Sequence, residues 1–258
     1  MELFLLGTGA AWPDADRNAP SFLIRNNKKS YLIDCGGGTS HQLMKVGIPP
    51  SSLEQIFLTH IHIDHCVEFP SLVFGAYLTG KEGSFYVYGP KGTSRFADSI
   101  FNDVYDFARP MMKERRNKEI SIKTFEKENG LVYEDKNIKV EATPVIHGIP
   151  TIAYKFSSNE KSIVLSSDTA PCQSLIDISK NADILVAECS FPEDFGPKPG
   201  HLIPSQVAKI ATKASVKKLI LVHLFPPCKG KEKDILNEVK KGFSGAVEIG
   251  YDLQKFEI

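Results

Sequence analysis

Short apolar runs bounded by turn residues recur along the chain and predict β-strands. They lie at residues 2–6, 21–25, 30–34, 53–58, 85–88, 120–125, 138–142, 151–156, 161–165, 183–187, 218–222 and 246–256. Other segments carry apolar residues at helical spacing and predict helices around 41–44 and at 66–78, 93–109, 172–179, 204–213 and 232–243. Strands come in runs at first and later alternate with helices. This order predicts an α/β fold with two sheets and helices outside them.

The densest group of candidate metal ligands follows the strand predicted at 53–58. Three of the seven histidines and one carboxylate stand in the run His60-Ile61-His62-Ile63-Asp64-His65. We expect this run on the loop where the strand ends. His60 and His62 are two residues apart in extended backbone, so they point the same way and can hold one ion. Asp64 and His65, past the turn, can hold a second. The alternative of a solvated histidine cluster is disfavoured, because this set suits zinc-like metals.

Four further candidates each come soon after a predicted strand. They are His147, Asp168, Glu188 and His223. Strand ends converge on one edge of a sheet, so we expect these side chains to meet the first cluster there.

Composition restricts the class of protein. The 258 residues suffice for one large domain, and we expect a single domain at 1–258. A formal net charge of zero argues against a strong sequence-independent grip on nucleic acid. No signal peptide or membrane-length apolar stretch is recognisable, and the five cysteines form no Cys-x-x-Cys pair. We therefore expect a cytoplasmic protein with reduced thiols and no membrane partner.

The run His60-x-His62-x-Asp64-His65 after an apolar strand resembles the signature of the metallo-β-lactamase superfamily of hydrolases. The resemblance implies a four-layer αββα sandwich. It also implies two metal ions, with Zn²⁺ favoured and Mn²⁺ or Fe²⁺ as alternatives. By the same resemblance one metal takes His60, His62 and His147, the other takes Asp64, His65 and His223, and Asp168 bridges both. Asp34 is implied as a support behind the metal loop.

The later motifs resemble the ribonuclease Z-like branch of this superfamily. Asp168-Thr169, then Glu188-Cys189-Ser190-Phe191, then Gly200-His201, follow that branch in order. The resemblance implies that His201 donates a proton to the leaving group and that Glu188 orients it. A surface-loop histidine is the alternative for His201. Asp168 follows His147 by only 21 positions. This leaves room for two strands and a turn, whereas ribonuclease Z carries a long tRNA-binding arm there.

Three other features have competing interpretations. Gly36-Gly37-Gly38 could cradle a phosphate, but a tight turn into the next helix is favoured. Cys66 adjoins His65 and could be a ligand, but a small buried thiol is favoured. The basic residues from Lys113 to Lys118 are interpreted as a solvent-exposed surface. The alternative is that they bind an anionic substrate.

These features predict a metal-dependent hydrolase. Two metals about 3.5–4 Å apart lower the pKa of a water between them, so that hydroxide attacks phosphorus or carbon near neutral pH. Asp64 is expected to orient this nucleophile as well. The favoured substrate is a small or cyclic phosphodiester. The alternatives are an arylsulfatase or esterase, a tRNA 3′ endonuclease that binds RNA through 113–118, and a carrier with a vestigial site. The oligomeric state stays open, with a homodimer as one option.

Overall fold

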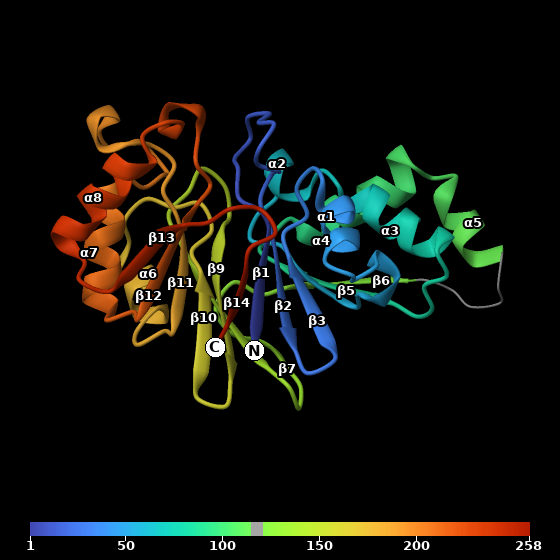
Figure 1. Cartoon of the computed structure of the whole chain (residues 1–258). Helices are drawn as coiled ribbons and strands as arrows, with labels where there is room; N and C mark the ends of the chain where they lie inside the picture. The colour runs from blue at the N-terminus through green and yellow to red at the C-terminus, as the bar shows by residue number, and fades with distance from the viewer. Residues whose placement is uncertain (115–120) are drawn as a thin grey trace.

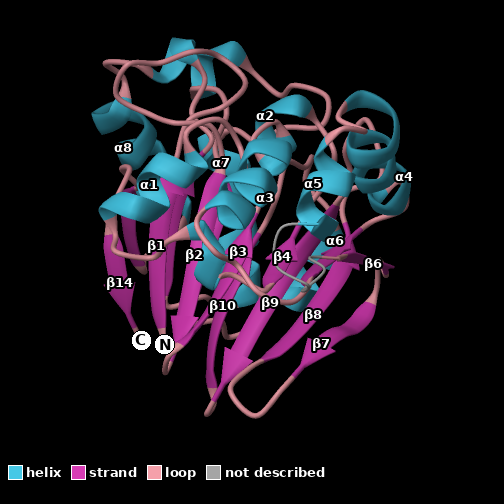
Figure 2. Cartoon of the chain, turned by 90° about the vertical axis from the view of Figure 1, so that its right-hand side faces the viewer, coloured by secondary structure: helices cyan, strands magenta, loops and turns pink. Residues whose placement is uncertain are grey.

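The computed structural model describes residues 1–114 and 121–258. Two seven-stranded sheets lie face to face, and helices cover the outer face of each (Figures 1 and 2). The first sheet has the order β14-β1-β2-β3-β4-β5-β6, and the second has the order β13-β12-β11-β10-β9-β8-β7. This is the predicted αββα sandwich. Within the described residues, no helix combines the length and apolar character that a membrane span needs.

The strands of the first sheet are β1 (Glu2–Gly7), β2 (Ser21–Asn26), β3 (Lys29–Ile33), β4 (Gln55–Phe57), β5 (Phe85–Gly89), β6 (Ile122–Glu126) and β14 (Lys255–Glu257). Those of the second are β7 (Gly130–Glu134), β8 (Lys139–Pro144), β9 (Ile152–Ser158), β10 (Lys161–Leu165), β11 (Ile184–Glu188), β12 (Lys218–Val222) and β13 (Ala246–Ile249). The helices are α1 (Thr39–Lys45), α2 (Ile63–Cys66), α3 (Phe69–Leu78), α4 (Thr93–Ser99), α5 (Ala108–Glu114), α6 (Gln173–Ile178), α7 (Pro204–Ala214) and α8 (Glu232–Gly242).

Alternation along the strands creates three apolar layers. In β1, Leu3 and Leu5 face the second sheet, whereas Phe4 and Leu6 face the helices α1 and α3 on the outside. In β11, Ile184 and Val186 likewise join the core between the sheets, and the residues next to them face α7 and α8. Successive side chains in a strand point to opposite faces, so a strand apolar at every position is buried on both. This is why the central strands read as continuous apolar runs.

Three sequence-based predictions of elements were wrong. The expected helix at 93–109 is broken, because α4 runs into a π-helical turn at Ile100–Val104 and α5 starts only at Ala108. The expected helix at 66–78 is divided into α2 and α3, and Pro70 stands in the first turn of α3, where it lacks an N–H to continue an earlier helix. Strand β7 was missed. Its pattern is only partly apolar because it lies at the edge of its sheet.

The edge of the first sheet carries an ion-pair cluster that gives a pH-dependent prediction. The hydrogen bond from Arg25, helped by Lys255, lowers the pKa of Glu2 to about 2 from its ordinary 4.5. A lowered pKa stabilises the fold above pH 4.5 and loses this effect as the pH falls toward 2. We expect Glu2→Gln to lose about 0.5–1 kcal/mol at pH 7, as for a partly exposed pair, and less as the pH falls from 5 to 3. Urea unfolding measures this, with Glu160→Gln on an exposed turn as the control. An equal loss at both ends of that pH range would contradict it.

Candidate metal centre

The predicted ligands meet where the carboxyl ends of several strands from both sheets come together. His60 and His62 follow β4, Asp168 follows β10, and His223 follows β12. Their side-chain nitrogen and oxygen atoms form two neighbouring groups, each with all ligand atoms within 4.8 Å of one another. The first group is His60, His62, His147 and Asp168, and the second is Asp64, His65 and His223.

The local structure differs from the prediction at Asp64 and His65. These two residues lie in the single helical turn α2 and not on a loop. The turn aims both side chains at His223, whose Nε2 lies 3.4 Å from Asp64 Oδ2. His65 Nε2 lies 3.6 Å from the same carboxylate. His60 and His62 therefore lie on an extended segment, whereas Asp64 and His65 lie on the helical turn that follows it, and this change of backbone divides the four residues into two pairs.

Backbone strain gathers at this edge. Asp34, Ser167 and His223 all have positive φ, at 56°, 58° and 59° respectively. L-residues rarely adopt this left-handed conformation, and outside glycine it costs free energy that the rest of the fold must offset. Each of the three residues comes just after the end of a buried strand. The strained turns redirect the chain at the point where it delivers a functional side chain.

Asp168 lies between the two groups. Its Oδ2 is 3.3 Å from His223 Nε2 and 3.9 Å from both His60 Nε2 and His147 Nε2. Its Oδ1 is 3.5 Å from His65 Nε2. Burial would raise the pKa of Asp168, but His223 and His65 outweigh this and hold it well below the usual range. An ionised carboxylate within reach of both groups is what a bridging ligand requires.

The donor chemistry of the first group fits a divalent cation. His147 Nδ1 lies 3.0 Å from the Gly200 carbonyl oxygen, so this nitrogen carries the proton and Nε2 keeps its lone pair. That Nε2 and His60 Nε2 each lie 3.1 Å from His62 Nδ1. Ligands about 2.0–2.1 Å from a tetrahedral zinc are separated by about 3.3 Å, close to these spacings. Burial lowers the pKa of His60 and of His62, which keeps both in the neutral form that binds metal.

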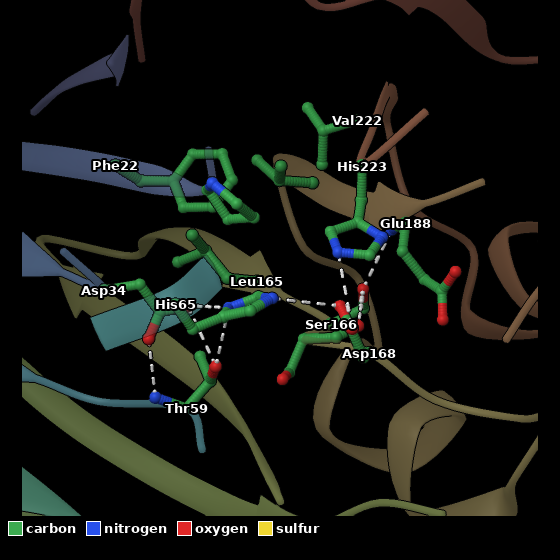
Figure 3. Close-up of a pocket in the computed structure, with 13 residues that line it drawn as sticks. Phe22, Asp34, Thr59, His65, Leu165, Ser166, Asp168, Glu188, Val222 and His223 are labelled. Atoms are coloured by element: carbon green, nitrogen blue, oxygen red, sulfur yellow. Dashed lines mark hydrogen bonds and ion pairs between the residues drawn. The ribbon is translucent and has the colours of Figure 1, made fainter. Parts of the chain in front are cut away.

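The second group contains an orphaned ligand atom. His65 Nδ1 lies 2.8 Å from Asp34 Oδ2, and since a carboxylate only accepts, the ring donates from Nδ1 (Figure 3). The buried His65 Nε2 then has no hydrogen-bond partner. Burial would lower the pKa of His65, but Asp168 and Asp34 outweigh it and raise this pKa well above the usual value, so a cation between Nε2 and the carboxylates of Asp64 and Asp168 would take the place of a proton. The residues of both groups therefore fit metal ions.

Asp34, for which the resemblance implied a supporting role, contacts the loop and the helical turn that carry the histidines. Its carboxylate accepts hydrogen bonds from the Thr59 backbone N–H and from the Thr59 hydroxyl, both at 2.8 Å, as well as from His65. Beneath His65, Asp168 and His223, a cavity of about 20 Å³ reaches the core between the sheets (Figure 3). This volume holds about one water molecule, so the centre is closed on its inner side.

We expect Asp34→Asn to lower metal affinity about 10–100-fold, as is typical for a partner of a metal-binding histidine. An amide NH₂ facing Nδ1 would favour a proton on Nε2 and block the ligand atom. Asparagine tolerates the positive φ of this position, so the fold is expected to survive. Zinc competition against a chromophoric chelator measures the affinity. Asp183→Asn, at a buried carboxylate that accepts from the Ser162 N–H in the second sheet, is the matched control.

Glu188 and His201 lie beside the two groups. His201 Nδ1 is 3.3 Å from both carboxylate oxygens of Glu188. Burial would lower the pKa of His201, but the hydrogen bond to Glu188 outweighs it and raises this pKa above the usual value. His201 is half-buried, and it forms a third group of ligand atoms with Asp168 and His223. The structure thus brings every predicted site residue to one place.

Sequence reasoning missed Ser190, which links Glu188 and His201 to His223. Its hydroxyl contacts the Glu188 carboxylate and lies 3.2 Å from His201 Nδ1 and 3.0 Å from His223 Nδ1. Ser190 follows Glu188 by two residues in extended backbone, so both side chains point the same way. This period-two spacing was visible in the sequence, but a lone serine carries no metal signal.

The structure also shows the surroundings of the remaining features, which are the glycine turn, Cys66 and His41. Glu68 accepts hydrogen bonds from the Gly38 and Ser40 N–H groups, so the glycine turn leads into α1 and its amides are taken by a carboxylate. Cys66 is a buried thiol that donates to the His62 carbonyl, and burial raises its pKa to about 12. His41 is exposed on α1. The basic residues from Arg115 to Lys118 lie outside the described residues.

The fold and this donor set define a class. The solved structures of the metallo-β-lactamase-fold protein YhfI from Bacillus subtilis and of human tRNase Z, short form, have TM-scores of 0.82 and 0.79. Each is 23% identical to the chain and is matched over 100% of the chain and 99% of its own length. A curated ribonuclease Z from Listeria welshimeri is 30% identical over 315 aligned positions, which cover 100% of the chain and 99% of the relative.

The protein is a metal-dependent hydrolase of the metallo-β-lactamase superfamily, in its ribonuclease Z-like branch. Residues 1–248 match the family described as anti-Pycsar protein Apyc1, and the chain belongs to this family.

Proposed function

We propose that residues 1–258 form one domain that hydrolyses a small or cyclic phosphodiester with two divalent metal ions. His60, His62 and His147 would hold one ion, and Asp64, His65 and His223 the other, with Asp168 shared. Zn²⁺ is favoured for this nitrogen-rich set, with Mn²⁺ or Fe²⁺ as alternatives. The observation that carries the proposal is the adjacency of two ligand groups around one ionised carboxylate.

The chain's own residues have separate tasks in this proposal. When bound, the metals supply a nucleophile from water near neutral pH and neutralise charge on the phosphoryl oxygens. Asp64, at the inner face of α2, orients the attacking oxygen. His201 gives a proton to the leaving oxygen, and Glu188 holds the ring by its Nδ1 for that transfer.

A small substrate is supported by what lies between His147 and Asp168. This interval forms the hairpin β9–β10, whose antiparallel strands turn back at Asn159 and Glu160. The alignment with the Listeria ribonuclease Z is longer than the chain, so that relative has residues that this chain lacks. The zero net charge points the same way, because an RNA-binding arm would normally add Lys and Arg.

A tRNA 3′ endonuclease is the second candidate, because a relative with 30% identity over the whole chain bears the name ribonuclease Z. It predicts tRNA binding that weakens steeply with salt. The proposed phosphodiesterase predicts cleavage of small diesters and no such binding.

The test is turnover of bis(p-nitrophenyl) phosphate, p-nitrophenyl sulfate and p-nitrophenyl acetate by zinc-loaded, manganese-loaded and chelated protein. Metal-dependent cleavage of the diester alone supports the proposal. Cleavage of the sulfate or acetate instead would identify a sulfatase or esterase. With two metals bound and no turnover of any ester, the protein would be a carrier with a vestigial site.

We also propose a cytoplasmic location, supported by the five cysteines, which are all free thiols. The oligomeric state is open, with a homodimer as one option, and sedimentation equilibrium at micromolar protein decides between one chain and two. A sedimenting mass equal to one chain would contradict the dimer.

A further inference from the structure

The chain between β13 and β14 connects the two sheets. It leaves the edge of the second sheet and joins the first sheet next to β1 (Figure 1). On the way, the Gly250 N–H donates to the Leu221 carbonyl of β12 at 2.8 Å, and the Leu253 N–H donates to the Leu5 carbonyl of β1 at 2.6 Å. Residues 250–254, the crossing segment, are therefore hydrogen-bonded to both sheets.

Asp252 is the main hydrogen-bond acceptor of the crossing segment. Its Oδ1 accepts from the Thr8 backbone N–H at 2.9 Å and from the Thr8 hydroxyl at 2.7 Å. Its Oδ2 accepts from the backbone N–H and the side-chain amide of Asn18 at 2.7 and 2.8 Å, and the Gln42 amide nitrogen lies 3.3 Å away. One carboxylate thus holds together the end of β1, the loop before β2 and the helix α1.

Thr8 is held by charged groups on two sides. Its side chain is buried, and its hydroxyl donates to Asp252 and accepts from the Arg17 guanidinium at 2.7 Å. Arg17 also donates to the Gly250 carbonyl at 2.6 Å, so the crossing segment fixes the guanidinium as well. Hydrogen bonds to charged groups are stronger than neutral ones, so the Thr8 peptide has little freedom to turn.

The Thr8 carbonyl connects this arrangement to the metal centre. It accepts the His223 backbone N–H at 2.9 Å. The positive φ of His223, 59°, is a conformation that persists only where the surrounding contacts fix it. The ring of His223 is fixed separately, because the Ser190 hydroxyl lies 3.0 Å from its Nδ1. Thr8 therefore fixes the backbone of the ligand whose Nε2 faces Asp64 and Asp168.

We propose that Asp252 is a positioning residue for the second metal site and acts through Thr8 on the backbone of His223. This inference rests on the two-metal site of the proposed function and adds to it a residue outside the ligand set. A residue that directly supports a metal ligand contributes about 10–100-fold to metal affinity. Asp252 is one contact further away, so the expected contribution is at the lower end of that range, about tenfold.

The first test is the zinc affinity of Asp252→Ala, measured by competition against a chromophoric chelator. We expect two zinc-binding steps in the wild type, with one of them weakened about tenfold in the variant. The other step should be unchanged, because Thr8 contacts His223, which belongs to the second ligand group. Equal weakening of both steps, or of neither, would overturn the proposal.

A double variant tests whether the effect passes through His223. Once His223 is absent, Asp252 has no ligand left to position. His223→Ala and His223→Ala/Asp252→Ala should therefore bind their remaining zinc with the same affinity. A further tenfold loss in the double variant would overturn the proposal.

Asp135→Ala is the matched control for a general loss of stability. Asp135 is also half-buried, and it accepts hydrogen bonds from Lys29, Tyr31, Tyr133 and two backbone N–H groups. Lys29 begins β3, and the other end of that strand leads to Asp34, so this cluster lies at the end of the sandwich away from the ligands.

Both Asp135→Ala and Asp252→Ala should unfold at lower urea concentration, and only Asp252→Ala should lose zinc affinity. A similar loss of affinity in both would overturn the proposal. If Asp252→Ala does not fold, Asp252→Asn is measured. The amide oxygen can still accept from Thr8 but the amide nitrogen cannot accept from Asn18, so the same zinc step should weaken by a smaller factor. Wild-type affinity at both steps would overturn the proposal.

Turnover separates this inference from the function on which it rests. Because Asp252 is proposed to act on metal affinity, excess zinc should restore the kcat of Asp252→Ala on bis(p-nitrophenyl) phosphate to nearly the wild-type value. A kcat that stays low when both sites are filled would overturn the positioning role alone. If the wild type binds two zinc ions and cleaves no ester, the proposed hydrolysis fails, and the zinc affinities still decide the role of Asp252. Fewer than two zinc ions in the wild type would overturn both.

Discussion

Asp168→Ala is expected to abolish hydrolysis, with kcat/KM lowered by about 10³-fold or more. Loss of a residue that only supports a ligand costs about 10–100-fold, and Asp168 is proposed to contact both metals directly. Its Oδ2 lies 3.3 Å from His223 Nε2, and its Oδ1 lies 3.5 Å from His65 Nε2. Without this carboxylate, five histidines converge on two sites with only Asp64 to balance the cationic charge.

The measurement for Asp168→Ala is metal content per chain after dialysis, by mass spectrometry, together with diester turnover. We expect fewer than two metals per chain and a preserved circular dichroism spectrum. Asp177→Ala, which removes an exposed carboxylate on α6, is the matched control and should keep both metals and full activity. Two metals and wild-type turnover in Asp168→Ala would exclude the bridging role.

His201→Ala is expected to lower kcat about 10²- to 10⁴-fold, the usual contribution of a positioned proton donor, without loss of metal. The size of this effect should depend on the leaving group. A p-nitrophenolate leaves without a proton, so its ester should be cleaved by the variant at a rate close to the wild type. A sugar alkoxide needs the proton, so a diester with that leaving group should show the full loss.

This dependence distinguishes a proton donor from a structural histidine or a third metal ligand. A structural role would lower the rates for both leaving groups alike. A ligand role, which the grouping of His201 with Asp168 and His223 would permit, would lower the metal content as well. Glu188→Gln keeps the size of the side chain and should reproduce the leaving-group dependence with a smaller loss, because the amide oxygen can still accept from His201 Nδ1 but a neutral amide no longer stabilises the protonated ring.

The sequence indicated the layers of the fold and the members of the site because both depend on short-range patterns. Continuous apolar runs such as 184–187 predicted strands buried on both faces, and those strands form the centre of the second sheet. Polar residues placed soon after such runs, as at His223, predicted side chains at the sheet edge. The spacing of His60 and His62 was enough to predict a shared direction, because the period of an extended chain is fixed.

Predictions were weaker where local preference and tertiary packing compete. The segment 93–109 has helical periodicity, yet it is interrupted at residues 105–107, between α4 with its π turn and α5. Among the described residues, strand β7 pairs with β8 only, and its half-polar pattern does not reveal a partner.

By itself, the sequence determined which residue types stand at strand ends, and therefore the donor set of the site. Only the tertiary structure decided how those donors are shared, since Asp168 reaches both groups through a turn with positive φ at Ser167. It also decided that Ser190 links Glu188, His201 and His223. These contacts join segments as far apart in the sequence as His65 and Asp168. Their geometry follows from how two sheets pack, which no local pattern encodes.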